Sequence, residues 1–460
     1  MNRILLKGAC LAAGVALFAT PAQADRRTSL AGNDLIQDAD DVFLFPQALH
    51  TYQNRLTLDL GMAEGSGGGL FSMGNDTMTF GAAMHRGPQE QLIVGWGSPD
   101  GSSARNREQD GQSGFGLALP GAAGVGGAPI ENIDLLFGMK ISDALGLGLR
   151  LGVGRGMAWS ETEVPDGDGT RTDTTYDNQN AINLRLGASY KSGSLHVDNA
   201  IHVVALSGAK VVDGKNTVNA SDTHFGLSTR GYLNISKGFD VGAVLGFNSG
   251  SGWAVNNADP DTEVTSIWTD TNVTIGAGPR VQIDDGPLVA AYAVINYNAA
   301  FNDPDTYQDS TDDTSTENDT VIPGLRMSAE YKVKPWITTR VGMEYNFTND
   351  ADYGFAGGNS VNTIAYASDF GWNAGMGFNF DKLQIDATLN HGSLYFLWQD
   401  APFAMVSATY SFGAPKGSSS RRPSRRSERS ERSERIDREA PSEPAEEAPA
   451  EQPVDNDDDF

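Results

Sequence analysis

The sequence has little cysteine, few long apolar stretches and few basic residues, and each shortage excludes some classes of protein. Cys10 is its only cysteine, in an apolar run at the start, so the rest of the chain has no thiol for a disulfide. After that run no apolar stretch approaches the roughly 20 residues that a membrane helix needs. Basic charge is also scarce. The net charge of −26 argues against nucleic acid as a partner.

The start of the chain has the layout of a secretory signal peptide. Arg3 and Lys7 supply the positive charge, residues 9–18 the apolar core, and Ala22-Gln23-Ala24 a small-residue cleavage site. We therefore expect residues 1–24 to be removed and the chain to be exported.

After residue 54 the sequence shows repeated alternation of apolar and polar residues, which is the period of a β-strand. Sixteen segments show it: 56–62, 78–84, 92–96, 133–139, 145–153, 182–190, 195–205, 225–235, 239–247, 273–283, 288–296, 325–333, 337–347, 370–380, 383–389 and 404–412. In a bilayer only helices and closed β-barrels satisfy every backbone group. We predict an all-β fold over residues 55–412, a transmembrane antiparallel β-barrel of about 16 strands in the outer membrane of a Gram-negative bacterium, with outer-membrane lipid around it.

The connections alternate between short and long, which predicts the orientation. The short turns are at 142–144, 191–194, 236–238, 284–286, 334–336 and 381–382. Outer-membrane barrels have short periplasmic turns and long outer loops, so both ends of the barrel segment should lie on the periplasmic side.

The last alternating segment, 404–412, ends in Tyr410-Ser411-Phe412. It resembles the closing strand of bacterial outer-membrane β-barrels, which ends in Phe and is recognised by the barrel-assembly machinery. That resemblance predicts Tyr410 and Phe412 as the assembly signal and the machinery as a partner.

A second resemblance lies just before the first strand, in residues 38–49. Six residues match in register the N-terminal motif of the outer-membrane long-chain fatty-acid and aromatic-hydrocarbon transporter family: Asp38, Ala39, Val42, Phe43, Pro46 and Leu49. Phe45, Gln47 and Ala48 replace the family's Asn, Ala and Gly. The resemblance implies that residues 25–54 form a hatch-like segment inside the barrel, and the family's barrel makes fourteen strands the alternative count. The other interpretation is an ordinary lead-in to a strand.

If the apolar faces meet lipid, the residues between them line the lumen. On two adjacent segments Glu330 should face Arg340 and Arg326 should face Glu344, as pairs of opposite charge. Arg150, Arg185 and Arg230 should form one rung across neighbouring strands. We expect Arg150 opposite Arg185, and both Arg185 and Arg230 opposite Ala200. These seven charged residues are our candidate pore-lining residues. Asp198 could neutralise the arginine rung; the alternative is a rung that attracts anions.

The loop 98–130 is unusually apolar for a connection exposed to water. Phe115 and Leu117 lie among glycines, and Arg105 and Arg107 come shortly before them. We predict these four residues at the solute entry, where the arginines would meet a carboxylate. The alternative is a glycine-rich loop without such a role.

Residues 413–460 change character, with a basic section, Ser-Glu-Arg repeats and an acidic end. We predict a disordered periplasmic tail, with contact to the cell wall or another protein as the alternative. No arrangement of nucleophile, base and orienting group is identifiable, and we predict no enzyme activity, no metal site and no cofactor.

Two functions remain open. The first is an outer-membrane barrel that passes small or lipophilic solutes passively, with hydrophobic or anionic solutes as its ligands. The alternative is a structural or interaction barrel whose tail or loops bind partners without transport. The size of the barrel favours the first, because its lumen is too wide for side chains alone to fill.

Overall fold

The computed structural model describes residues 26–60, 67–84, 131–166, 169–212, 215–256, 264–284, 286–306, 315–356, 359–389 and 403–412. The chain divides into two units, Met1–Gly413 and Ala414–Phe460, and all described residues belong to the first. The predicted strand 92–96, the loop 98–130 and the tail 413–460 lie outside the described residues.

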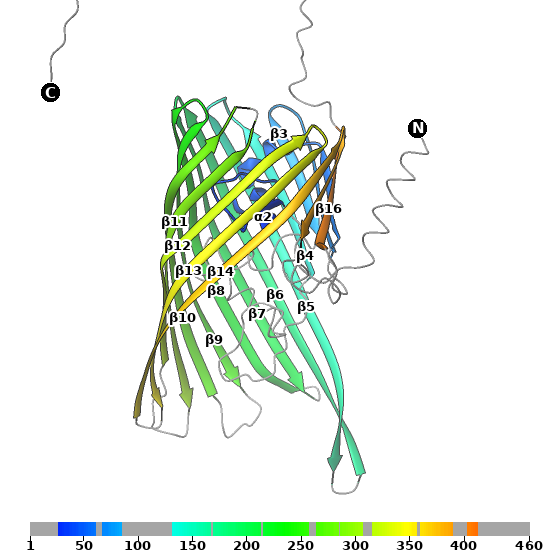
Figure 1. Cartoon of the computed structure of the whole chain (residues 1–460). Coiled ribbons are helices and arrows are strands. Elements are labelled where there is room, and N and C mark those ends of the chain that lie inside the picture. Colours follow the sequence, from blue (N-terminus) through cyan, green and yellow to red (C-terminus); the bar gives the residue numbers. More distant parts are fainter. Residues whose placement is uncertain are drawn as a thin grey trace, which may run out of the picture. The chain divides into compact units, whose positions relative to one another are not determined.

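The described residues form a closed barrel of sixteen antiparallel strands, which confirms the predicted fold class (Figure 1). Each strand pairs with its neighbours in the sequence, and the first pairs with the last. The strands are β1 (Arg55–Leu60), β2 (Gly67–Gly74), β3 (Met78–Met84), β4 (Glu131–Lys140), β5 (Leu145–Asp166), β6 (Gly169–Ser192), β7 (Leu195–Val212), β8 (Lys215–Ser236), β9 (Phe239–Asn256), β10 (Val264–Gln282), β11 (Leu288–Thr306), β12 (Ser315–Lys334), β13 (Ile337–Ala356), β14 (Asn359–Phe380), β15 (Leu383–Leu389) and β16 (Phe403–Ser411).

One strand of the sixteen was not predicted from the sequence. β2 begins with three glycines, and its inward Leu70 and outward Phe71 are both apolar, so its pattern does not alternate. Leu70 is apolar because it packs against a segment inside the barrel.

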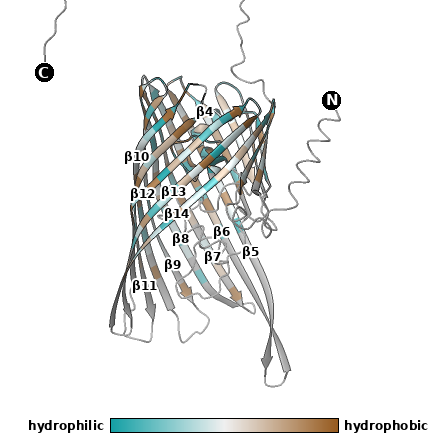
Figure 2. Ribbon diagram, viewed as in Figure 1, coloured by the Kyte–Doolittle hydropathy of each residue, from teal (hydrophilic) through white to brown (hydrophobic). Residues whose placement is uncertain are grey.

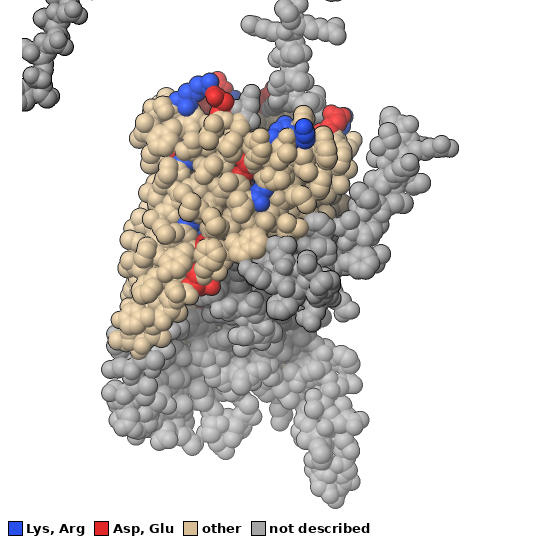
Figure 3. Space-filling view, in the orientation of Figure 1, with Lys and Arg blue, Asp and Glu red and all other residues tan. Residues whose placement is uncertain are grey.

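Along the other strands the two faces separate as predicted. On β6 the outward Ile182, Leu184 and Leu186 are 54%, 43% and 48% exposed, whereas the inward Asn183 and Arg185 are both 0% exposed. Figure 2 shows the same change between hydrophobic and hydrophilic residues along the strands. In Figure 3 the charged residues gather along the rim formed by the short turns, above a face that is mainly uncharged.

The short turns all join strands at one end of the barrel. Residues with positive φ close four of them: Gly193 at +55° and Gly238 at +77°, where glycine has no Cβ to strain, and Asp284 at +42° and Asp381 at +55°. The same end holds the start of β1 and the end of β16, where the amide of Phe412 donates to the carbonyl oxygen of Asn54 at 3.1 Å. The chain therefore enters and leaves the barrel at its short-turn end.

Residues 26–54 lie inside the barrel, and we call them the plug (Figure 1). Its short helices are α2 (Arg26–Ser29), α3 (Asp41–Leu44) and the 3-10 helix η1 (Pro46–His50), which begins with a proline that has no backbone N–H to leave unsatisfied. No helix in the described part of the chain is long and apolar enough to cross a membrane.

The plug packs against the wall through two apolar clusters. One joins Leu30, Leu35 and Phe45 to wall residues that include Tyr232 and Tyr292. The other joins Val42, Phe43 and Leu49 to Leu70, Ala83 and Leu136 of β2, β3 and β4. Val42, Phe43 and Leu49, all in the transporter-like motif, are completely buried.

Candidate functional site

The contact between plug and wall is built around three buried arginines. Arg150 of β5, Arg185 of β6 and Arg230 of β8 are 1%, 0% and 1% exposed. Each donates from Nη1 to a plug carbonyl oxygen: Arg150 to Phe43 at 2.9 Å, Arg185 to Leu44 at 3.3 Å and Arg230 to Asp34 at 3.1 Å. The arginines thus hold plug backbone groups that would otherwise be buried without a partner.

The charges of these arginines are balanced unequally. Arg150 forms a bidentate ion pair with Asp134 of β4, donating from Nε at 2.7 Å and from Nη2 at 3.1 Å. Arg230 pairs with Asp41 of the plug at 2.7 Å and with Asp198 of β7 at 3.5 Å. Among the described residues no carboxylate forms an ion pair with Arg185.

The register of the rung was predicted only in part. Arg150 does face Arg185 across β5 and β6, as expected. Arg185 faces His202, however, and Arg230 faces Asp198, so the prediction that both face Ala200 was wrong. The reason lies in the turns: the tight turn after β6 is made by Gly193 and Ser194, slightly later than the centre assumed from the sequence.

A second set of charges joins the plug to the opposite side of the wall. Arg26 of α2 donates from Nε to Glu330 of β12 at 2.6 Å and lies 3.5 Å from Asp38. Arg340 of β13 continues the chain, with Nε 2.7 Å from Glu330 and Nη1 2.6 Å from Asp386 of β15. Carboxylates and guanidiniums therefore alternate from plug to wall.

The predicted pairs of opposite charge on β12 and β13 are confirmed. Glu330 faces Arg340 and Arg326 faces Glu344 in the strand register. Arg326 approaches Glu344 at 3.5 Å and also donates to the side-chain oxygen of Asn346 at 2.7 Å.

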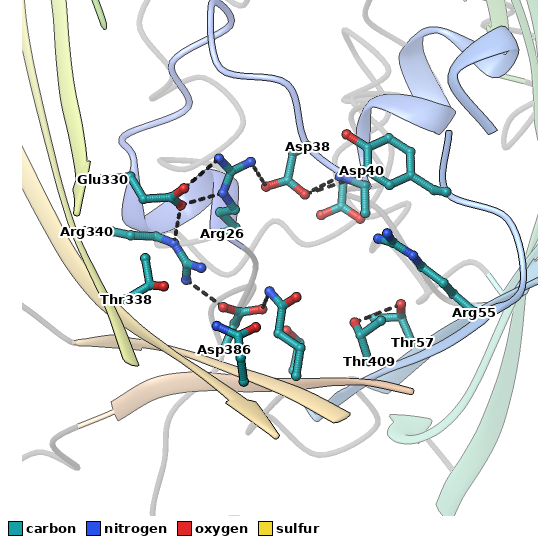
Figure 4. Close-up of a pocket in the computed structure, with 15 residues that line it drawn as sticks. Arg26, Asp38, Asp40, Arg55, Thr57, Glu330, Thr338, Arg340, Asp386 and Thr409 are labelled. Carbon is teal, nitrogen blue, oxygen red and sulfur yellow. Dashed lines mark hydrogen bonds and ion pairs between the residues drawn. The ribbon is translucent and has the colours of Figure 1, made fainter. Parts of the chain in front are cut away.

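These charges line a cavity of about 270 Å3 between plug and wall (Figure 4). Arg26, Asp38 and Asp40 come from the plug, and Glu330, Arg340 and Asp386 from the wall, with Arg55 of β1 across the cavity. Burial raises the pKa of Asp38 to about 6, against the opposing pull of Arg26 and with help from the nearby Asp40 and Asp41 carboxylates. Asp38 is thus a plug carboxylate that changes charge near neutral pH.

Glycines in the wall provide the space for the plug backbone. A Cβ at Gly148 would overlap the backbone nitrogen of Gln47, and one at Gly187 would overlap the side-chain oxygen of the same residue. Gln47 lies in this space and donates from Nε2 to the carbonyl oxygens of Ala188 at 3.1 Å and Asn199 at 3.4 Å. The family's Ala at this position is replaced by a residue that bonds to the wall.

Other predicted site residues lie elsewhere. Arg105, Arg107, Phe115 and Leu117 are outside the described residues. Tyr410 and Phe412 are on the outer face, 44% and 40% exposed. The Phe412 ring stacks on Phe71 of β2 with centroids 5.7 Å apart.

The plug side of the site was not found from the sequence. Asp34 and Asp41, the wall partner Asp134 and the bonding role of Gln47 were all missed. One signal was available: on β5 the inward positions next to Arg150 are glycines, Gly146, Gly148, Gly152 and Gly154. Several inward glycines in one strand indicate that another backbone approaches closely.

No protein-family model and no curated protein matches the sequence. Solved structures similar to it include a Pseudomonas aeruginosa FadL homologue, at 14% identity and a TM-score of 0.42, covering 86% of this chain and 100% of that one. Another is the CymD monoaromatic hydrocarbon channel, at 11% identity and a TM-score of 0.35, covering 86% of this chain and 99% of that one. These likenesses are too low to assign the chain to a family.

The architecture itself decides the location. A closed antiparallel barrel with an apolar outer face, a polar inner face and short turns at one end is that of an outer-membrane protein of a Gram-negative bacterium.

Proposed function

We propose that the protein is a plugged outer-membrane channel that passes small or lipophilic solutes passively, and that the plug is its gate. The observation that carries this proposal is the way the plug is held. Among the described residues the wall is closed by strand pairing from β1 around to β16, and the plug adds one backbone hydrogen bond to that ladder, from the Phe412 amide to the carbonyl oxygen of Asn54 at the junction with β1. The plug can therefore leave without breaking the barrel.

The contacts that hold the plug are of a reversible kind. They are separate hydrogen bonds and ion pairs, such as those of Arg26, Arg150 and Arg230, together with two modest apolar clusters. A sixteen-stranded barrel encloses a lumen wider than its own side chains fill. When the plug leaves, Arg150, Arg185 and Arg230 line the open passage, which is the role predicted for them.

The test is conductance in planar bilayers, for the full chain and for a chain that lacks residues 25–54 behind an intact leader. We expect a closed or rarely open full chain and a steady, larger conductance after the deletion. If neither protein conducts and neither takes up solute, the structural or interaction barrel is the correct function.

The solute class is tested by uptake into vesicles. We propose that a hydrophobic carboxylate enters past Arg105 and Arg107, so that Arg105→Ala with Arg107→Ala weakens uptake of octanoate and leaves uptake of an uncharged hydrocarbon unchanged. Equal loss of both would assign the loop no role in recognising the carboxylate.

A further inference from the structure

Arg185 is the one arginine of the three that forms no ion pair among the residues that the structure describes. It is 0% exposed, and its single hydrogen bond goes from Nη1 to the Leu44 carbonyl oxygen at 3.3 Å. Its Nε and Nη2 atoms are buried without a hydrogen-bond partner. The two arginines at its sides have Asp134, Asp41 and Asp198.

One more buried donor without a partner, Ser228 of β8, lies on the same inner wall, two strands from Arg185. His202 of β7 lies between them: it faces Arg185 in the strand register, and its Nε2 donates to the side-chain oxygen of Asn248 at 3.3 Å, so the Nδ1 of the neutral ring is an acceptor. Ser228 is two residues beyond Gly226, which faces His202, and its Oγ lacks a partner. We call Arg185 and Ser228 the donor cluster, because each can donate a hydrogen bond.

Docking the plug therefore has a local cost at this point. A guanidinium loses its water and regains one backbone acceptor, and each buried donor left without a partner keeps its desolvation penalty uncompensated. Once the plug has left, Arg185 faces the lumen and can bind a ligand. Anything that binds only this released state favours release.

We propose that the donor cluster is an oxyanion-binding site that opens when the plug leaves, and that a carboxylate competes with the plug for Arg185. The guanidinium fork matches a carboxylate at two points, and the hydroxyl of Ser228 adds an uncharged donor on the same inner wall. The proposal goes beyond the channel function, because it holds whether or not solute crosses the barrel. The oxyanion is either a small free carboxylate or the head group of an amphipathic one.

The test measures release of the plug directly and does not use conductance. Val42 is completely buried in the plug, and Val42→Cys places a reporter thiol there. In lipid vesicles at constant ionic strength, chloride is exchanged for acetate and the rate of labelling by a water-soluble maleimide is followed. Acetate at about ten times its dissociation constant should raise labelling about tenfold.

Variants of the arginines decide whether Arg185 is responsible. Arg185→Gln should abolish the response to acetate, whereas Arg185→Lys, which keeps the charge and loses the fork, should retain a weaker one. The matched control is Arg326→Gln, which removes an inward arginine that bonds to Glu344 and Asn346 of the wall, and it should leave the response intact.

The source of the oxyanion is decided by repeating the titration with octanoate. An effect at much lower concentration than acetate assigns an amphipathic carboxylate, and an effect at equal concentration assigns a small free one. No response to either anion in the unmodified wall, or an equal response in Arg185→Gln, would overturn the proposal.

Discussion

At the scale of single residues, the inner wall is shaped by what the plug needs at each position. Glycine occurs where plug backbone touches the wall, and arginine where a plug carbonyl must be satisfied. Apolar wall residues such as Leu136 occur where plug side chains pack. The inner face of the wall is thus complementary to the plug in shape and polarity.

Gly148 provides a sharp test of this match. We expect Gly148→Ala to weaken plug docking by about 1–3 kcal/mol, because the new methyl group overlaps the backbone of Pro46 and Gln47. The rate of labelling at Val42→Cys should rise accordingly. Gly231→Ala is the control, since a Cβ there meets nothing closer than 3.9 Å; equal effects of the two changes would show that strand distortion and not the plug is responsible.

Asp38 makes docking depend on pH. Its pKa is raised to about 6 in the docked plug, from an ordinary value of 3.8. The docked plug therefore holds this proton more tightly than the released one, so the contribution of Asp38 to docking is full below about pH 4 and is lost as pH rises through about 6. This amounts to at most about 3 kcal/mol.

We expect the full chain to conduct more often at pH 7 than at pH 5, and Asp38→Asn to remove most of that difference. Asp143→Asn, in an exposed turn, serves as the control and should behave like the unchanged protein. A pH dependence that survives Asp38→Asn would assign it to other carboxylates.

At the scale of elements, strands were predictable where one face meets lipid and the other is polar. The outward Ile182, Leu184 and Leu186 give a period of two that only a strand explains. β2 was not predictable in this way, because its inward Leu70 packs against the plug, and apolar residues on both faces of a strand remove the period. The plug itself has no period, and only its resemblance to a known motif drew attention to it.

The candidate site was predictable on its wall side only. Charges facing each other on β12 and β13 follow from the turn between them, so Glu330 and Arg340 could be paired in advance. Glu330, the wall partner of Arg26, lies 304 positions away in the chain, and Asp41, which pairs with Arg230, belongs to a plug without the period of a strand. No spacing rule connects such residues.

The closing strand allows a prediction for assembly. Phe412 directly follows β16, and its amide bonds to Asn54 just before β1, so this strand completes the closure. Deleting residues 413–460 should leave membrane insertion intact, and deleting residues 404–412 should abolish it. Fractionation of outer membranes would check both, and the reverse result would place the assembly signal in the tail.

At the scale of the whole molecule, the barrel and the plug are joined by polar anchors on different sides of the wall. Arg26 bonds to Glu330 of β12, and Gln47 bonds to the carbonyl oxygens of Ala188 and Asn199 on β6 and β7. These two anchors share no partner. A plug that leaves as one unit must break both of them in the same step, whereas a plug that peels away in parts breaks them in turn.

Changing the two anchors singly and together distinguishes a plug that leaves as one unit from a plug that peels away in parts. Arg26→Met and Gln47→Ala should each weaken docking by about 1 kcal/mol, the net value of a typical hydrogen bond or somewhat more. If the plug leaves as one unit, both changes act on one equilibrium, and the double variant should show their sum within about 0.5 kcal/mol in the labelling rate at Val42→Cys. If Val42 labels at the same rate with and without Arg26→Met, the end of the plug at α2 opens separately from its core, and the gate has more than one step.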